Sequence, residues 1–276
     1  MRIVLFAPIN NSQYSRAVVH QLLNIAAINF QAIMVRNLWN INRIKNEIHR
    51  DGARLFTKVI KKIFLSPKPT NSYTPDFRKS TARDQESNKG TLRKIARENQ
   101  IKYVIVQNFN NEISEKFLCE IKPDLIIFTG GGLIRKNILS IPKIGILNCH
   151  TGILPNYRGM DVVEWTALEE AIDKIGFGVT LHFMDKGVDS GPILLTHEEP
   201  IKKDDTFSSI RERLEVRMAQ LMLEGIEKIM NNAVHPIEQK QNEGKQYFVM
   251  HPRLKRIAIE KLSLYLKSRP SLENQK

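Results

Sequence analysis

Polar side chains with complementary chemistry follow a short apolar run near the middle of the chain. Asn148 and His150 come directly after residues 144–147, a run typical of a buried strand. Because alternate side chains leave the same side of an extended backbone, we expect the amide and the imidazole on one face. An amide can donate a hydrogen bond to a developing oxyanion, and an imidazole titrates near neutral pH. The pair therefore suits chemistry at a carbonyl carbon.

A carboxylate that can join this pair lies in a glycine-rich segment further along the chain. Asp189 is expected at the crest of a tight turn between two strand-like runs. A carboxylate stabilises a neighbouring imidazolium and can accept a proton from an attacking amine, directly or through water. Asn148, His150 and Asp189 together suit acyl or formyl transfer to an amine, in which the amine is the nucleophile.

Each of these residues also has a simpler structural interpretation. An Asn-x-His spacing occurs by chance, and a histidine after a strand often only forms hydrogen bonds in the core or in a loop. Asp185 and Asp189 can serve only to form the turn. Cys149 is a rival nucleophile, but its place between Asn148 and His150 directs it to the opposite face, where it is expected as a buried core thiol.

Strand-like and helix-like patterns alternate around these residues. Apolar runs predict strands over residues 2–9, 31–35, 103–106, 125–128, 144–147, 178–183 and 193–195. Amphipathic patterns predict helices over residues 12–28, 42–65, 93–98, 113–119, 136–139, 162–171 and 206–230, and a last basic helix that ends near 266. This alternation indicates an α/β protein with a doubly wound, mainly parallel sheet. In such sheets ligands bind beyond the carboxyl ends of the strands, where residues 148–150 are expected.

Domain organisation follows from the same patterns. Residues 1–230 are expected to form one catalytic domain, and residues 231–276 a short C-terminal α/β extension with the basic helix. Residues 66–91 contain Pro67, Pro69 and Pro75 among polar residues and show no period. A long segment of this kind inside a domain is usually functional or disordered, so we interpret it as a mobile surface loop rather than an inert linker.

Composition and charge exclude several classes of protein. The chain of 276 residues carries 42 Lys and Arg against 29 Asp and Glu, a net charge of +13. The excess lies at the two ends, and it can attract phosphates or remain on solvated helix faces, which is the interpretation we favour. No nucleic-acid-binding motif accompanies it, so a nucleic-acid partner is not indicated. No apolar run approaches the ~18 residues of a membrane span, and two cysteines fit a reducing compartment, so we expect a cytoplasmic protein. Metal-binding spacings are missing, and no metal is expected.

Three segments resemble the 10-formyltetrahydrofolate-dependent formyltransferase family. They read PDLIIFTGGGLI at 123–134, NCHTGILPNYRG at 148–159 and GVTLHFMDKGVDSGPIL at 178–194. The resemblance covers about residues 100–230 and implies a Rossmann-like core. It also implies that Asn148, His150 and Asp189 match the catalytic trio of the family.

The resemblance further implies a folate co-substrate, 10-formyltetrahydrofolate, and residues that would hold each reactant. The residues expected against the folate pteridine are Gly132, Leu133, Ile134, Asp185, Gly187 and Val188. The residues expected near the acceptor amine are Asn10, Tyr157 and Arg158. Basic side chains of the N-terminal half can meet a diphosphate there.

Within the family, the sequence resembles the sugar N-formyltransferases of polysaccharide synthesis most. The segment APINNS at 7–12 lacks the glycine-rich phosphate loop of glycinamide ribonucleotide formyltransferases. Residues 231–276 are fewer than the C-terminal β-barrel domain of methionyl-tRNA formyltransferases needs. We therefore expect the primary amine of a nucleotide-linked amino sugar as acceptor. Activities like those of the other two enzymes remain alternatives, as does a folate-binding deformylase, and a homodimer is compatible with the acidic middle and basic ends.

Overall fold

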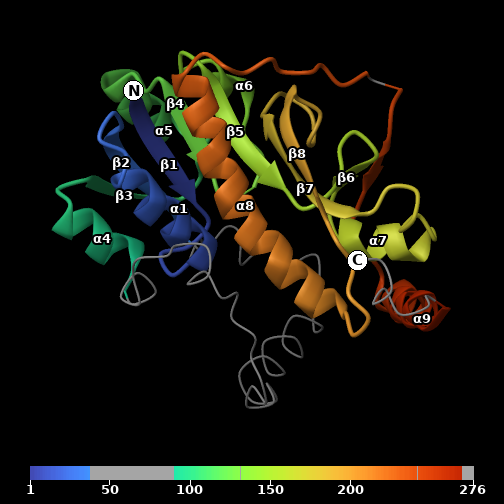
Figure 1. Cartoon of the computed structure of the whole chain (residues 1–276). Coiled ribbons are helices and arrows are strands. Elements are labelled where there is room, and N and C mark those ends of the chain that lie inside the picture. The colour runs from blue at the N-terminus through green and yellow to red at the C-terminus, as the bar shows by residue number, and fades with distance from the viewer. Residues whose placement is uncertain (38–89, 131, 241, 269–276) are drawn as a thin grey trace, which may run out of the picture.

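The short apolar runs of the sequence form one seven-stranded sheet. The structure is a computed structural model that describes residues 1–37, 90–130, 132–240 and 242–268. The sheet order is β3-β2-β1-β4-β5-β7-β8 (Figure 1). The strands are β1 (Arg2–Ala7), β2 (Asn29–Arg36), β3 (Lys102–Val106), β4 (Leu125–Phe128), β5 (Gly145–His150), β7 (Phe177–Phe183) and β8 (Ile193–Glu199). The first five pair in parallel, and β7 and β8 add to the edge in antiparallel fashion, so the predicted mainly parallel α/β sheet is confirmed.

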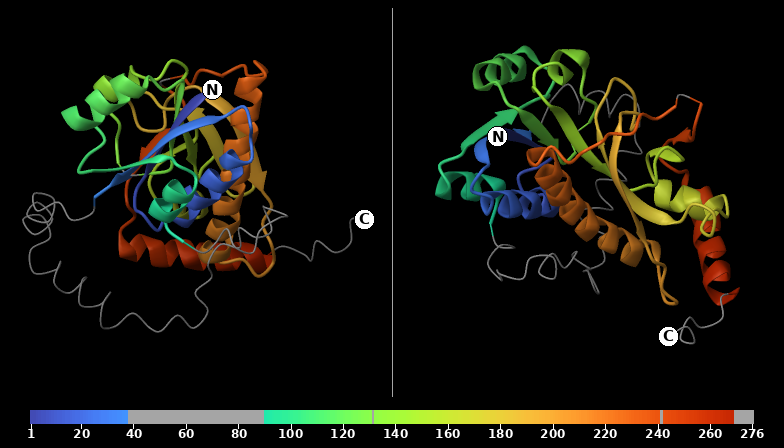
Figure 2. Two further views of the ribbon diagram at one scale, coloured as in Figure 1. Left: turned by 90° about the vertical axis from the view of Figure 1, so that its left-hand side faces the viewer. Right: turned by 45° about the horizontal axis from the view of Figure 1, so that its top comes forward.

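Helices cover both faces of this sheet. Along β1, Ile3 and Leu5 belong to one apolar cluster, whereas Val4 and Phe6 belong to another on the opposite face. The first face is covered by α1 (Gln13–Leu23), α4 (Leu92–Glu98) and α8 (Phe207–Met230), the second by α5 (Glu112–Ile121) and α6 (Lys136–Leu139). Figures 1 and 2 show α1 and α8 side by side on the first face. Because both faces are buried, the strands read as continuous apolar runs rather than as alternating ones.

Polar side chains define where the helices begin. The Ser12 side chain accepts a hydrogen bond from the backbone N–H of Ser15 at 3.1 Å, so the predicted cap of α1 is confirmed. Thr206 and Ser209 form a reciprocal capping box at the start of α8. The predicted end of the first helix at residue 28 is wrong, because α1 stops at Leu23 and the chain turns to enter β2.

A second, two-stranded sheet lies beside the first and was not predicted. It pairs β6 (Tyr157–Gly159) in parallel with β9 (Lys245–Tyr247). Next to it lie α7 (Val162–Leu168) and α9 (Pro252–Ser268), which pack on each other (Figure 1). The three residues of β6 lie in a segment rich in glycine and proline, which gives no strand signal in the sequence. They form a strand because β9, which is distant in sequence, pairs with them.

Two sequence predictions fall outside the described residues. These are the basic helix at 42–65 and all but the last two residues of the loop at 66–91. Among the helices that the structure does describe, none has the length and apolar character needed to cross a membrane.

Candidate active site

Strand β5 delivers the amide and the imidazole. The strand continues to His150, three residues beyond the predicted end, because β7 supplies an antiparallel partner for its last residues. Asn148 lies opposite His182 in this pairing, and His150 lies opposite Thr180. Nδ2 of Asn148 is 3.1 Å from Nε2 of His182. All four side chains therefore leave the sheet on the face that α5 and α6 cover further along.

The turn between β7 and β8 brings the carboxylate to this face. Oδ2 of Asp189 is 3.4 Å from Nδ1 of His150, and Oδ1 accepts a hydrogen bond from Nδ2 of Asn148 at 3.4 Å. The same Oδ1 is 3.5 Å from Nε2 of His182, and the backbone N–H of Gly159 donates to Oδ2 at 2.9 Å. The structure thus places the predicted trio together, and 15% of the Asp189 side chain stays exposed to solvent.

Burial and charge pull the pKa of Asp189 in opposite directions. Burial acts to raise this pKa, but the neighbouring imidazoles of His150 and His182 and the N–H of Gly159 outweigh it and lower the pKa to about 2. The carboxyl is therefore ionised throughout the physiological pH range. In His150 the balance is reversed, because burial lowers the pKa more than the Asp189 carboxylate raises it.

Each ring nitrogen of His150 faces a hydrogen-bond acceptor. Nε2 is 2.8 Å from the carbonyl oxygen of Tyr157, which can only accept, so Nε2 carries a proton. Nδ1 then faces Asp189, and only the imidazolium satisfies both acceptors. A proton on Nδ1 gives a buried ion pair next to the amide of Asn148, which is the arrangement that can stabilise a developing oxyanion.

Two further polar residues of β7 belong to this site and were missed. His182 contacts both Asn148 and Asp189, and its Nδ1 donates to the carbonyl of Phe183 at 2.8 Å. Thr180 Oγ1 donates to the carbonyl of Gly152 at 2.7 Å and so fixes the loop that follows β5. A signal was present, since Thr180 and His182 are alternate polar residues in an apolar strand, the same spacing as Asn148 and His150.

Other reactive groups near the trio have different environments. Cys149 lies on the opposite face in the apolar core, as predicted, and burial raises the pKa of its thiol well above the usual range. A thiol of this kind is a poor nucleophile at neutral pH. Within the described ranges, no group of three or more His, Cys, Asp and Glu side chains is arranged to hold a metal ion.

The residues predicted to hold the folate lie in two segments, the residues that follow β4 and the turn between β7 and β8. Leu133 is 67% exposed and its carbonyl accepts from Nδ2 of Asn110, while Ile134 is buried in the second apolar cluster. Asp185 accepts from the N–H of Gly187 at 2.9 Å and from the hydroxyl of Ser190 at 2.8 Å, so its carboxylate forms the turn. Gly132 and Val188 complete the two segments, and the folate-binding role of all six residues stays a prediction.

The side chains predicted to bind the acceptor have structural partners. Asn10 Oδ1 accepts from Tyr103 Oη at 2.9 Å and from the N–H of Arg93 at 3.0 Å. The hydroxyl of Tyr157 is 3.0 Å from Glu169, and Arg158 donates to the carbonyl of residue 243 at 2.7 Å. These contacts direct Tyr157 to the end of α7 and Arg158 to the C-terminal part of the chain, so a direct contact with the acceptor stays a prediction.

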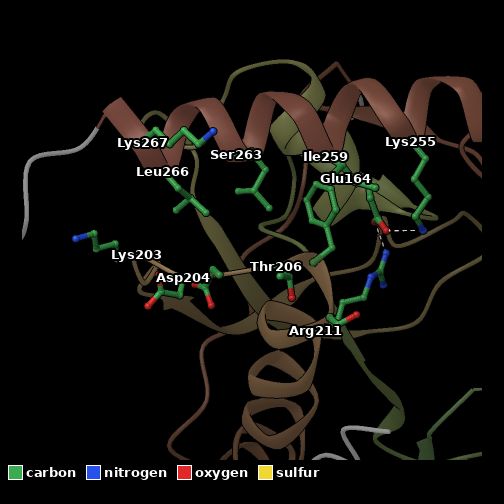
Figure 3. A pocket seen from close by; sticks show the side chains of 14 residues that line it. Glu164, Lys203, Asp204, Thr206, Arg211, Lys255, Ile259, Ser263, Leu266 and Lys267 are labelled. Carbon is green, nitrogen blue, oxygen red and sulfur yellow. Dashed lines mark hydrogen bonds and ion pairs between the residues drawn. The ribbon is translucent and has the colours of Figure 1, made fainter. Parts of the chain in front are cut away.

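A hollow of about 1030 Å³ lies elsewhere, between α7, α9 and the start of α8 (Figure 3). None of the trio lines it. The buried carboxylate of Glu164 contacts Arg211 and lies 2.7 Å from Nζ of Lys255 in its wall. These charges attach α9 to α7 and α8, and the hollow is not the site of the chemistry described above.

The fold and the site together define an α/β protein with an Asn-His-Asp trio at the carboxyl end of a parallel strand. The family model described as formyl transferase matches residues 74–226, more than half of the chain and the whole trio. The chain therefore belongs to the formyl transferase family.

Individual relatives differ in how much of the chain they match. A methionyl-tRNA formyltransferase of Thermotoga neapolitana is 34% identical over 146 residues, 52% of this chain and 46% of that protein. The chain thus spans about half the length of the curated relatives it matches. A sugar N-formyltransferase from Shewanella sp. FDAARGOS_354 has a similar fold, with a TM-score of 0.58 and 13% identity over 95% of this chain and 87% of that one. WlaRD, described as a sugar 3N-formyl transferase in the presence of dTDP and 5-N-formyl-THF, reaches a TM-score of 0.54 and 17% identity over 100% and 84%.

Proposed function

We propose that this protein transfers the formyl group of 10-formyltetrahydrofolate to the primary amine of a nucleotide-linked amino sugar. The observation that carries the proposal is the convergence of Asn148, His150 and Asp189 within hydrogen-bond and ion-pair distance at one end of β5. Family membership supports a formyl group as the transferred unit. The folate donor is supported by the formyl-THF present with the WlaRD enzyme, whose fold this chain shares.

The reaction needs no nucleophile from the protein. The acceptor amine attacks the formyl carbon, and its lone pair forms the new C–N bond while the carbonyl electrons move to the oxygen. The amide of Asn148 and the imidazolium of His150 stabilise the resulting oxyanion. The carboxylate of Asp189 balances the imidazolium and takes up the ammonium proton, directly or through water. The bond to N10 of the folate then breaks, N10 is protonated, and the products are the formamide and tetrahydrofolate.

An amino sugar is the acceptor that the structural neighbours and the sequence after β1 support. The sugar N-formyltransferase folds match 95% and 100% of this chain, including the part that follows α8. The segment after β1 contains no glycine between Ala7 and Ser12, unlike the phosphate loop expected for a glycinamide ribonucleotide substrate. These observations favour a nucleotide-linked sugar over a ribonucleotide.

An acceptor panel tests the proposal. Purified protein would be incubated with 10-formyltetrahydrofolate and either UDP-, dTDP- or GDP-linked amino sugars, glycinamide ribonucleotide or methionyl-tRNA. We expect an N-formyl product from one nucleotide sugar, identified by mass spectrometry, together with release of tetrahydrofolate. Formylation of none of the amino sugars by active, folded protein would contradict the proposed acceptor.

Methionyl-tRNA is the second candidate acceptor, because the matching curated relatives are methionyl-tRNA formyltransferases and the net charge is +13. A tRNA substrate implies an affinity that falls steeply as salt concentration rises. Formylation of methionyl-tRNA in the panel, with such a salt dependence, would favour this candidate over the amino sugar.

A further inference from the structure

The backbone of Asp189 has a conformation that few residues other than glycine adopt. Its φ angle is +51°, in the left-handed region. A turn that contains such a residue keeps its shape only when contacts from outside hold it. Besides the contacts with Asn148, His150 and His182, two contacts hold Asp189 directly, one on the carboxylate from Gly159 and one on the backbone carbonyl from Gln239. Both depend on the C-terminal segment, which we define as residues 237–247 without residue 241.

The side chain of Gln239 makes the first contact between this segment and the turn of Asp189. Its Nε2 is 3.1 Å from the carbonyl oxygen of Asp189 and 2.6 Å from that of Gly191. Two carbonyls can only accept, so they require the NH₂ end of the amide at this position. Two residues earlier, Ile237 forms a two-way backbone bridge with Ile193 at the start of β8, with both distances 2.8 Å. The side chain of Gln239 is therefore anchored beside the turn that it holds.

Strand β9 makes the second contact indirectly, because it pairs with β6, which contacts Asp189. The N–H of Met160 donates to the carbonyl of Tyr247, and the N–H of Lys245 donates to that of Asn156, both at 3.0 Å. The rings of Tyr157 and Tyr247 stack with centroids 5.0 Å apart. Strand β6 in turn offers the carbonyl of Tyr157 to His150 and the N–H of Gly159 to Asp189. One short strand thus orients both partners of the ion pair, and β9 holds that strand.

Figure 1 shows the path that makes this possible. After α8 the chain passes the turn between β7 and β8, where Ile237 pairs with Ile193, and then descends to pair with β6. The family match ends at residue 226, so this segment lies beyond it.

We propose that the C-terminal segment is a positioning element of the active site, with Gln239 and β9 keeping Asp189 aligned with His150. The inference rests on the proposed function, since it assigns the ion pair to catalysis. Neither Gln239 nor β9 contacts the reacting groups in this role. Each acts through the turn of Asp189 or through β6.

Replacement of Gln239 tests this element. Gln239→Met keeps the length of the side chain but removes both hydrogen bonds, and Gln239→Asn keeps the amide but shortens its reach. We expect kcat to fall about tenfold or more in Gln239→Met, because small displacements of catalytic groups are costly, with KM for the folate donor unchanged. Gln239→Asn should show a smaller fall. Glu238→Gln is the matched control, since Glu238 is the exposed neighbour, and it should retain the wild-type values.

A measurement without substrate separates this inference from the proposed function. The titration of His150 would be followed by NMR of the imidazole nitrogens in the free wild-type and variant proteins. Because the Asp189 carboxylate raises the pKa of His150, its displacement should shift the titration to lower pH in Gln239→Met. A His150 titration unchanged in both folded variants would overturn the positioning role, whatever their activity. A shifted titration in a protein that formylates no acceptor would support the positioning role and reject the proposed function.

Discussion

At the scale of the residue, environment assigns different tasks to the members of the trio. The pKa of Asp189 is lowered to about 2, while burial lowers the pKa of His150 against the pull of that carboxylate. Because burial opposes protonation of His150 more strongly than the Asp189 carboxylate favours it, a further negative charge nearby, such as an oxyanion, would promote its protonation. The site is therefore suited to respond to the charge that would develop during the proposed formyl transfer.

Loss of Asn148 or His150 should reduce the rate rather than the affinity. We expect Asn148→Ala and His150→Ala to lower kcat by about 10²–10³, because the first removes a hydrogen-bond donor and the second a positive charge that stabilises the oxyanion in the transition state. The measurement is the initial rate of formyl transfer at saturating donor, with folding checked by circular dichroism. A variant that retains near wild-type turnover would remove that residue from the mechanism.

The lowered pKa of Asp189 predicts a specific response to acid. A carboxyl whose pKa is lower in the folded than in the unfolded state, where it is about 3.9, stabilises the fold above that value and loses this contribution as the pH falls toward 2. The contribution amounts to about 2 kcal/mol. Urea unfolding between pH 6 and pH 3 should therefore show a smaller loss of stability for Asp189→Asn than for wild type. Asp204→Asn, at an exposed aspartate, should follow the wild-type curve.

At the scale of the element, strand pairing decides what the sequence could only suggest. β5 continues through Asn148 to His150 because β7 pairs with it, and the three residues of β6 form a strand because β9 pairs with them. The apolar pattern within each segment could not reveal these partners. What local pattern did reveal was the central strands and most helices, such as β4 and α6, whose bounds match the prediction residue for residue.

Replacement of Gly159, at the contact between β6 and β9, should lower the stability of the fold. Its φ angle is +97°, and an added Cβ would lie 2.1 Å from the carbonyl oxygen of Tyr247. Gly159→Ala should lower the free energy of unfolding by about 1 kcal/mol for the backbone conformation and about 1–3 kcal/mol more for the overlap. Gly176→Ala is the control, because its φ of +79° carries a similar strain while the nearest atom to its added Cβ is 3.9 Å away. Equal losses in the two variants, measured by chemical unfolding, would show that the close approach of Gly159 is unimportant.

At the scale of the whole molecule, the part that follows α8 is attached both to the site and to the core. α9 packs on α7 through Ala258 and Leu262, and Lys255 adds an ion pair with the buried Glu164. The predicted division into residues 1–230 and 231–276 stays a proposal. In this structure the second part completes the surroundings of the trio in the first, since Gln239 and β9 both reach it.

Attachment of α9 should depend on its buried apolar face as well as on its ion pairs. Leu262 is 3% exposed, so Leu262→Ala should cost about 3 kcal/mol of stability through lost burial and the cavity left behind. Leu264, two residues on, is 66% exposed, and Leu264→Ala should change stability by less than about 0.5 kcal/mol. Urea unfolding and the rate of proteolysis within residues 252–268 measure the difference. Similar behaviour of the two variants would mean that α9 is not held against α7 as described.

The shared face of Asn148 and His150 and the fold class could be predicted from the sequence because both are encoded locally. Asn148 and His150 are two residues apart, so the geometry of a single strand puts them on one face, and alternating patterns indicate the α/β sheet. Local spacing also placed Cys149 in the core and Asp189 on its turn. A local pattern does not show what a single turn residue contacts. The role of Asp185 was therefore left open between forming the turn and binding the folate.

Only the tertiary structure decided how the trio is held. The partners of Asp189 come from residues 148, 150, 159, 182 and 239, and contacts across such distances in sequence leave no periodic trace in any one segment. Gln239 could not be selected in advance, because the path of the chain after α8 brings it to the site. The polar spacing in β7 marks His182, but only the register between β5 and β7 shows that it contacts the trio. Those features are set by the packing of the entire sheet and its helices, which is a property of all the residues together.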